Sequence, residues 1–234
     1  MKHLLCTAAL AAVLFSSGAQ AGAKPELDVT PDGIGSDSYI DDEYSFCIPA
    51  ATGHVKAGHD KSIGVAWSKG PEGTKSYAVV MVDVDVPTSF DDAGKEGKVL
   101  PADMERRSFY HWLLYDIPAS QVQIPANTDS DALVQHGKTE LKTPYGIRGI
   151  NDYAPYFASD PERKGVYAGY DGPCPPWNDA RIHHYHLKVF ALDVKSLGLT
   201  GPVTGPQLMD ALASHILAQG EVVGKYTLNA DIKK

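Results

Sequence analysis

The sequence predicts a mainly β protein, an antiparallel sheet or sandwich with one helix near the C-terminus. Three apolar runs are typical of strands, at residues 77–86, 109–117 and 183–194. A proline follows each of the first two runs, and a Gly-Pro-rich turn at residues 172–176 comes before the third. No internal repeat or boundary between domains is visible, so we expect residues 22–234 to form a single domain.

The alternation of side chains along a strand predicts which of them share a face. In residues 77–86, Ala78 and the even-numbered valines fall on one face. Asp83 and Asp85 fall on the other face, together with Tyr77, Val79 and Met81, and the two carboxylates should lie about 7 Å apart. In the other two strands, the residues predicted to share a face are His111 with Leu113 and Tyr115, Tyr110 with Trp112 and Leu114, His183 with Tyr185, and His184 with His186.

A helix is predicted after residue 204. Thr204 and Gln207 fit a capping box, and Pro206 stands in the first turn, where its missing N–H is tolerated. Apolar residues then recur at helical spacing as far as Gly220, which should end the helix. The residues of this stripe are Leu208, Met209, Leu212, Ile216 and Leu217.

The remaining segments are predicted to be short or irregular. Residues 44–48 and 62–68 have strand-like patterns, whereas residues 119–169 are rich in Gly, Pro and Asn and should be mostly irregular. Residues 88–108 form a polar connection that is longer than most loops in compact domains. We therefore expect this loop to cover part of the protein.

The N-terminal residues 1–21 have the pattern of a secretory signal peptide. Lys2 is followed by an apolar run at residues 4–15 and by Ala-Gln-Ala at residues 19–21, a typical cleavage site. No later segment has enough unbroken apolar residues to span a bilayer as a helix. We therefore expect a soluble, exported protein that is periplasmic or secreted.

Charge and cysteine content narrow the range of partners. The formal charge is −8 for the whole chain and −9 once Lys2 is removed with the signal, and no run of Lys or Arg offsets it. Nucleic acid and anionic membrane surfaces are therefore poor electrostatic partners. Cys47 and Cys174 would remain, either paired as a disulfide in an oxidising compartment or as buried free thiols.

Four polar residues at the ends of predicted strands point to a small pocket: Asp83, Asp85, His111 and His183. They could bind a polar or zwitterionic ligand, with imidazole toward its anionic part and carboxylate toward its cationic part. They could instead hold a divalent metal or carry out acid–base hydrolysis. The usual metal-binding spacings and the Gly-x-Ser-x-Gly motif of hydrolases are absent, so we expect no metal, no cofactor and no catalytic residue.

At these residues the chain resembles the phosphatidylethanolamine-binding protein (PEBP) family, particularly its bacterial Raf-kinase-inhibitor-like branch. The resemblance covers residues 62–226 and rests on several motifs that occur in the family's order. The motifs are Asp83-Val84-Asp85-Val86-Pro87, His111-Trp112-Leu113, Asp116-Ile117-Pro118, Gly169-Tyr170-Asp171-Gly172-Pro173-Cys174-Pro175-Pro176, His183-His184-Tyr185, residues 190–193, and Gly224-Lys225-Tyr226.

The resemblance implies a β-sandwich with a large antiparallel central sheet, a few peripheral helices and an anion-binding pocket at one end. It also implies a non-enzymatic protein that binds phosphate, carboxylate or phospholipid headgroups. Several members of the family inhibit kinases or proteases. The pocket residues carried over from the motifs are Asp83, Asp85, Pro87, His111, Tyr170, Gly172, Pro173, His183 and Tyr185.

Two departures from the family's motifs change the expected pocket. Val84 replaces a proline and restores an N–H, and His184 replaces an arginine, which removes a permanent charge. We expect an exported binding protein for a small anionic or zwitterionic ligand. The alternative is an inhibitor or interaction module for an exported protease or another protein, acting through the loop at residues 88–108. A hydrolase is the least favoured interpretation, and a homodimer is left open.

Overall fold

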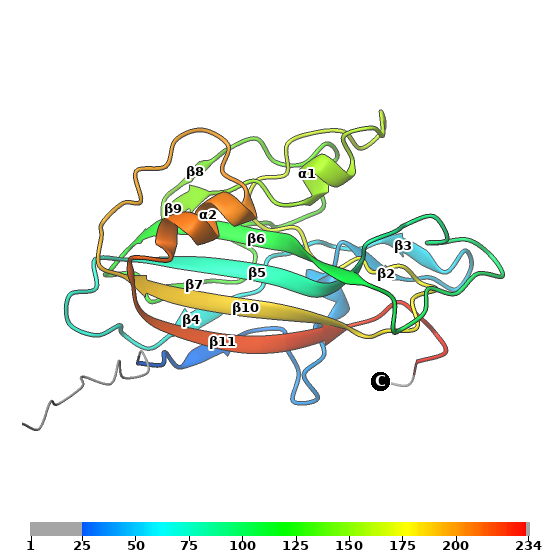
Figure 1. Cartoon of the computed structure of the whole chain (residues 1–234), viewed down its shortest axis with the longest axis horizontal. Helices are drawn as coiled ribbons and strands as arrows, with labels where there is room; N and C mark the ends of the chain where they lie inside the picture. The colour runs from blue at the N-terminus through cyan, green and yellow to red at the C-terminus, as the bar shows by residue number, and fades with distance from the viewer. Residues whose placement is uncertain (1–24, 233–234) are drawn as a thin grey trace, which may run out of the picture.

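β-strands dominate the computed structural model, which describes residues 25–232 (Figure 1). The predicted signal peptide at residues 1–21 lies outside the described residues. Within residues 25–232, no helix has the length and apolar character needed to cross a bilayer. The elements are β1 (Val29–Pro31), the 3-10 helix η1 (Asp42–Tyr44), β2 (Cys47–Pro49), β3 (Val55–Ala57), β4 (Val65–Trp67), β5 (Ser76–Pro87), β6 (Arg106–Pro118), β7 (Gln123–Ile124), β8 (Lys142–Thr143), β9 (Gly146–Arg148), α1 (Tyr153–Tyr156), β10 (His183–Leu192), α2 (Gly205–Leu212) and β11 (Ile216–Tyr226).

Six strands form the central sheet in the order β11-β10-β5-β6-β9-β8, and all neighbouring strands are antiparallel. A smaller sheet, β1-β4-β7, lies behind the central sheet in Figure 1, and α2 lies on the opposite face. The strands β2 and β3 form a separate pair near one end of the central sheet (Figure 1). The predicted fold class, a sandwich built on a large antiparallel sheet, is therefore confirmed.

β5 is buried on both faces because it lies in the middle of the central sheet and between two layers. Tyr77, Val79 and Met81 pack into the core beneath the smaller sheet. Ala78 and Val80 pack on the other face, together with the apolar residues of α2. These are the two faces predicted from the sequence. Burying one large apolar side chain contributes roughly 1.5–3 kcal/mol, so β5 is a major source of the stability of the fold.

The predicted C-terminal helix is too long. Its capping box is present, but α2 ends at Leu212. Ile216 and Leu217, assigned above to the helical stripe, instead begin β11, which pairs with β10. Without this pairing β10 would be an open sheet edge, and the gain in backbone hydrogen bonds outweighs the helical pattern. Gly220 lies within β11, where a Cβ atom would stand only 2.1 Å from the carbonyl oxygen of Leu27.

The two short strands predicted near the N-terminus are smaller than expected. Residue 44 belongs to η1, and the strand of the first segment covers only Cys47–Pro49. In the second segment only Val65–Trp67 is a strand. Residues 119–169 contain only the short elements β7, β8, β9 and α1, which agrees with the prediction of a mostly irregular segment.

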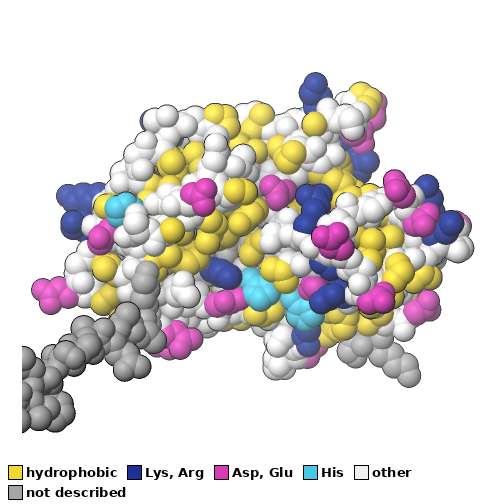
Figure 2. Space-filling view, in the orientation of Figure 1, with side chains coloured by type: hydrophobic (Ala, Val, Ile, Leu, Met, Phe, Trp, Pro, Cys, Tyr) yellow, Lys and Arg dark blue, Asp and Glu magenta, His cyan; other side chains and the backbone are white. Residues whose placement is uncertain are grey.

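The visible surface has mixed charge. On the face seen in Figure 2, Lys and Arg side chains are interspersed with Asp and Glu, so no extended basic patch covers this face. Apolar side chains are exposed near its centre, between the charged groups.

Cys47 and Cys174 form a disulfide, with Cα atoms 4.8 Å apart. The sequence left open whether these cysteines are paired or are free thiols, and in the structure they are paired. The bond joins β2 to the Gly-Pro-rich segment before β10 and closes a loop across 127 residues. A cross-link over so long a loop restricts the unfolded chain strongly and thereby favours the folded state.

Loss of this disulfide should lower the stability of the protein. We expect Cys47→Ala/Cys174→Ala to reduce the free energy of unfolding by about 2–5 kcal/mol, because the unfolded chain regains its entropy. Urea denaturation with and without a reductant measures the effect. The double variant is the control, since the reductant should leave its midpoint unchanged. Equal midpoints for oxidised and reduced wild type would contradict a stabilising role.

Candidate ligand-binding site

A cavity of about 400 Å³ lies at the end of the central sheet where β5 ends and β10 begins. Its inner end is polar and buried, and consists of Asp83, His111, His183 and Tyr185. The rest of the lining is mostly apolar or aromatic, so the cavity combines an apolar wall with a few convergent polar groups, as small-molecule sites usually do. Phe90, Tyr156 and Trp177 are partly exposed and form its mouth, whereas Phe109, Tyr153 and Leu228 are buried deeper in the wall.

A β-bulge directs His111 into the cavity. β5 and β6 shift register at this point, so that one step along β5 corresponds to two residues of β6. The extra residue interrupts the alternation of faces. Tyr110 packs toward α2, and the His111 ring lies edge-on to Tyr185, with ring centroids 5.2 Å apart. The prediction that His111 shares a face with Leu113 and Tyr115 is therefore wrong, because those two residues lie in the core beneath α2.

A second irregularity separates Asp83 from Asp85. The pairing of β5 with β6 shifts again between Asp83 and Val86. Asp83 lines the cavity, whereas Asp85 pairs with Arg181 at 2.7 Å and accepts hydrogen bonds from the backbone and the ring of His184. Asp83 therefore lines the cavity and Asp85 does not, because Asp85 is engaged by Arg181 and His184.

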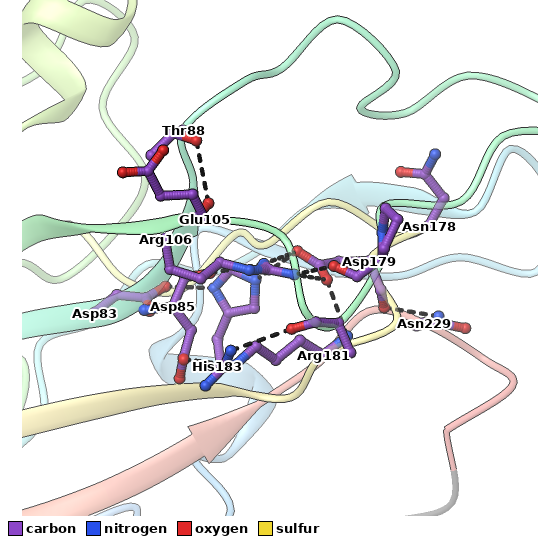
Figure 3. A network of polar contacts seen from close by, with 12 residues as sticks. Asp83, Asp85, Thr88, Glu105, Arg106, Asn178, Asp179, Arg181, His183 and Asn229 are labelled. Carbon is purple, nitrogen blue, oxygen red and sulfur yellow. Dashed lines mark hydrogen bonds and ion pairs between the residues drawn. The ribbon is translucent and has the colours of Figure 1, made fainter.

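His183 lies between two carboxylates (Figure 3). Its Nδ1 is 2.6 Å from Oδ2 of Asp83, and its Nε2 is 3.1 Å from Oδ2 of Asp179. Both ring nitrogens can donate only if the imidazole is protonated. Burial would lower the pKa of His183, but the carboxylates of Asp83 and Asp179 raise it to about 9. At neutral pH the ring is therefore an imidazolium that holds Asp83 in place and has no nitrogen left for a ligand.

Arg106 completes this network (Figure 3). Its guanidinium donates to both carboxylate oxygens of Asp179, at 2.6 and 3.0 Å, and to the backbone carbonyls of Asp85 and Pro101. Burial opposes the ionisation of Asp179, but the hydrogen bonds from His183 and Arg106 hold its pKa below the usual value. Sequence reasoning missed Arg106 and Asp179, because both lie in or beside loops and match no motif.

His111 has different surroundings from His183. Its Nδ1 is 2.9 Å from the backbone carbonyl oxygen of Asp171, which can only accept, so Nδ1 carries the proton. Burial lowers the pKa of His111, against the opposing effect of Asp83 and Asp171. The ring is therefore neutral at neutral pH, and its Nε2 keeps a free lone pair.

Tyr185 supplies the donor at the inner end. Its hydroxyl is buried and has no hydrogen-bond partner among residues 25–232. Burial, followed by the neighbouring Asp83 carboxylate, holds the pKa of Tyr185 well above its usual value. The hydroxyl is therefore a neutral phenol whose hydrogen-bonding capacity is not satisfied by the described part of the chain.

Five of the nine predicted ligand-binding residues do not line the cavity. Tyr170 and Gly172 donate hydrogen bonds to residues 44–60, and the carbonyl of Pro173 accepts the N–H of Cys47. These contacts hold the wall of the cavity from behind. The five residues are Asp85, Pro87 (the last residue of β5), Tyr170, Gly172 and Pro173.

The long loop covers the cavity, as its length suggested. It extends over residues 88–105, and Phe90 and Gly94 contribute to the cavity lining. Asn178 holds the loop in place: its side-chain amide donates to backbone carbonyls of the loop, the nearest at 2.8 Å, and accepts the N–H of Gly94 at 2.9 Å. The role of this loop in binding another protein stays a prediction.

Comparisons with known proteins agree with this fold. The family model for phosphatidylethanolamine-binding protein matches residues 34–227. The chain therefore belongs to the PEBP family, as its motifs indicated. The protein YbcL of Escherichia coli is 29% identical over 229 residues, which cover 97% of this chain and 100% of YbcL. A UPF0098 protein of Aquifex aeolicus is 31% identical over 170 residues, which cover 72% of this chain and 75% of that protein.

A solved structure supports the same assignment. The crystal structure of E. coli YbcL, described as a new member of the mammalian PEBP family, matches with a TM-score of 0.61 and 26% sequence identity. The match covers 89% of this chain and 99% of that chain. The overall fold is thus shared over nearly the whole of the known structure.

The pKa of His183 predicts how stability depends on pH. The folded state raises this pKa from 6.5 to about 9, so the stabilisation is complete below pH 6.5 and is lost as the pH rises through 9. We expect the free energy of unfolding to fall by on the order of 3 kcal/mol over this range. Urea denaturation at several pH values measures it.

The control for this experiment is a histidine in an exposed pair. His183→Gln should flatten the pH profile, because the titrating group is removed. His215→Gln removes the pair with Asp193 at the other end of β10 and should keep the profile of the wild type. A wild-type stability that stays constant across this range would show that His183 is not a buried imidazolium.

Asn178→Ala should release the loop over the cavity. We expect the amide of Gly94 to exchange with deuterium at least about tenfold faster, because its acceptor is lost, while amides in the middle of β5 keep their protection. The matched control is Thr88→Ala, which removes one hydrogen bond to the carbonyl of Glu105 at the base of the loop. Equal protection of Gly94 in both variants would argue against a holding role for Asn178.

Proposed function

We propose that this protein is an exported, non-enzymatic binding protein whose cavity holds a small anionic or zwitterionic group, such as phosphate, a carboxylate or a phospholipid headgroup. The observation that carries the proposal is the buried hydroxyl of Tyr185, which stands without a partner beside Asp83 at the inner end of a preformed cavity. Buried polar groups in folded proteins are nearly always hydrogen-bonded, so a ligand is the natural partner.

The shape and polarity of the cavity support a ligand with a polar head. The inner end offers a phenol donor, the lone pair of His111 and the carboxylate of Asp83. The aromatic mouth would contact a less polar part of the ligand. A zwitterionic headgroup could place its ammonium group at Asp83 and an anionic oxygen at Tyr185, as we expected for this combination of residues.

Two features favour binding over hydrolysis. Both nitrogens of His183 are engaged with carboxylates, so this residue could act as a general base only by breaking the network. The two cysteines that line the cavity are bonded to each other, so neither offers a thiolate.

Export is supported by the sequence and by the disulfide. Residues 1–21 have the composition of a secretory signal. The disulfide between Cys47 and Cys174 would persist in an oxidising compartment and would be reduced in most cytosols. A periplasmic or extracellular location accounts for both observations.

A titration followed by NMR tests the proposed pocket. Purified mature protein is titrated with phosphate, acetate and phosphoethanolamine, and the ring signals of His111 and His183 are recorded. We expect saturable shifts, and Tyr185→Phe should weaken phosphate binding at least about tenfold, because a hydrogen bond to a charged group is lost.

Tyr156→Phe is the matched control for this variant. Tyr156 also lines the cavity, but it lies at the mouth and is 44% exposed. Its loss of a hydroxyl should change the affinity by less than about twofold, because water can replace the hydrogen bond. Histidine signals that do not respond to any of the three compounds would contradict the assignment of the pocket.

A further inference from the structure

The inner end of the cavity is richer in hydrogen-bond acceptors than in donors. Each carboxylate oxygen of Asp83 accepts one hydrogen bond from the protein: Oδ1 from the N–H of Asp85 at 2.8 Å and Oδ2 from His183 at 2.6 Å. A carboxylate oxygen can accept two, so each keeps a free position. His183 is protonated, so Asp83 lies beside an opposite charge.

His111 adds a second acceptor. Its Nδ1–H is committed to the carbonyl of Asp171, so Nε2 presents a lone pair. The groups that face this ring are Asp83 from β5, His183 and Tyr185 from β10, Tyr153 from α1, and Asp171 from the loop before β10. Among them the donor that is still free is the hydroxyl of Tyr185.

Little positive charge is available to a ligand at this depth. Arg163 is the one lysine or arginine among the described residues that line the cavity. It lies over the ring of Phe157 and pairs with Asp160, and its side chain is 57% exposed. The charge of His183 is already shared between two carboxylates. An oxyanion at the inner end would therefore meet two acceptors and one donor.

This pattern distinguishes between oxyanions by whether they keep a proton. Sulfate and phosphodiesters are fully ionised at neutral pH and would place lone pairs against Asp83 and Nε2 of His111. Hydrogen phosphate keeps a P–OH group, which can donate to one of these acceptors while another of its oxygens accepts from Tyr185. When an oxygen of the ligand faces Asp83 or Nε2 of His111, both groups are hydrogen-bond acceptors. Each gives up its hydrogen bonds to water on binding and gains none in return, which strongly disfavours the complex.

We infer that the cavity selects oxyanions that carry a proton, namely hydrogen phosphate and singly ionised phosphate monoesters, and rejects sulfate and phosphodiesters, with Asp83 and Nε2 of His111 as the selecting acceptors. The inference rests on the proposed anion pocket and narrows its ligands: phosphate and a free monoester such as phosphoethanolamine would bind, whereas a carboxylate and the diester headgroup of an intact phospholipid would be rejected. The shared chemistry is a P–OH group, so the free ion and a monoester are two sources of the same ligand.

The first test uses the wild-type protein and simple ions. Calorimetric titration at neutral pH and constant ionic strength compares phosphate with sulfate. Phosphate should bind at least about tenfold more tightly, because sulfate leaves an acceptor unpaired. Equal affinities would overturn the inference and leave the proposed function standing. Failure of both ions, and of every other anion, would overturn the proposed function and the inference with it.

A second test separates monoesters from diesters without any substitution. A monoester loses its last proton near its second pKa, about 6, whereas a diester has none to lose. Methyl phosphate should therefore exceed dimethyl phosphate in affinity at about pH 5.5, and the ratio of the two affinities should fall at about pH 7.5. Protonation of His111 at low pH would strengthen the binding of both esters. Comparing the ratio of their affinities, rather than either affinity alone, therefore cancels this effect. A ratio that does not change with pH would count against selection by a proton.

A substitution then assigns the selection to one residue. Asp83→Asn replaces an acceptor with an amide that can also donate, so sulfate should approach phosphate to within about threefold. The matched control is Asp193→Asn, which alters another Asp–His pair at the far end of β10 and should keep the preference of the wild type. If Asp83→Asn does not fold, the comparison of the two esters decides the question alone. Retention of full selectivity in a folded Asp83→Asn protein would overturn the role of Asp83.

Discussion

The pairing of β5 between β6 and β10 is the constraint on which the rest of the structure depends. It gives β5 two buried faces and places the smaller sheet and α2 on opposite sides of it. It also fixes the site, because the register sets Asp83 opposite Tyr185, where its carboxylate bonds His183. A slip of one residue would turn every side chain of β5 to the other face and remove Asp83 from the cavity.

The charges at the inner end show how such a site is kept in one arrangement. Arg106, Asp179, His183 and Asp83 alternate in sign, and all four are almost completely buried. Isolated buried charges are strongly disfavoured, and burying a pair is tolerated when each member keeps its hydrogen bonds. The network therefore fixes the geometry of the site, since it leaves Asp83 one position to occupy. His183, which the motifs suggested as a ligand contact, acts here through Asp83.

Much of the fold could be predicted from the sequence, because it depends on local patterns. The alternation in β5, the prolines that end β5 and β6, and the capping box of α2 all have the expected structural counterparts. The two β-bulges beside the site could not be predicted, because a bulge arises from the fit between two strands and has no local pattern of its own. The extent of β11 likewise depends on its pairing with β10. The hydrogen bonds gained along the edge of β10 outweigh the helical spacing of apolar residues in this segment.

The residues of the site that belong to strand motifs could be predicted from the sequence, and those that reach the site through tertiary contacts could not. Asp83, His111, His183 and Tyr185 all line the cavity. The aromatic mouth collects residues from segments that are far apart in the chain, and no motif connects them. Arg106 and Asp179 belong to the site only because a loop brings the start of β6 beside the turn before β10.

Two consecutive residues connect the loop over the cavity with the charges inside it. Asn178 holds the loop, and Asp179, the next residue, holds His183 and through it Asp83. A displacement of this dipeptide would change both contacts at once, so the opening of the entrance and the acceptor strength of the inner end are mechanically linked. Linkage of this kind is reciprocal. A bound group that strengthens the inner network would therefore also hold the loop more firmly, because Asn178 and Asp179 are adjacent in the chain.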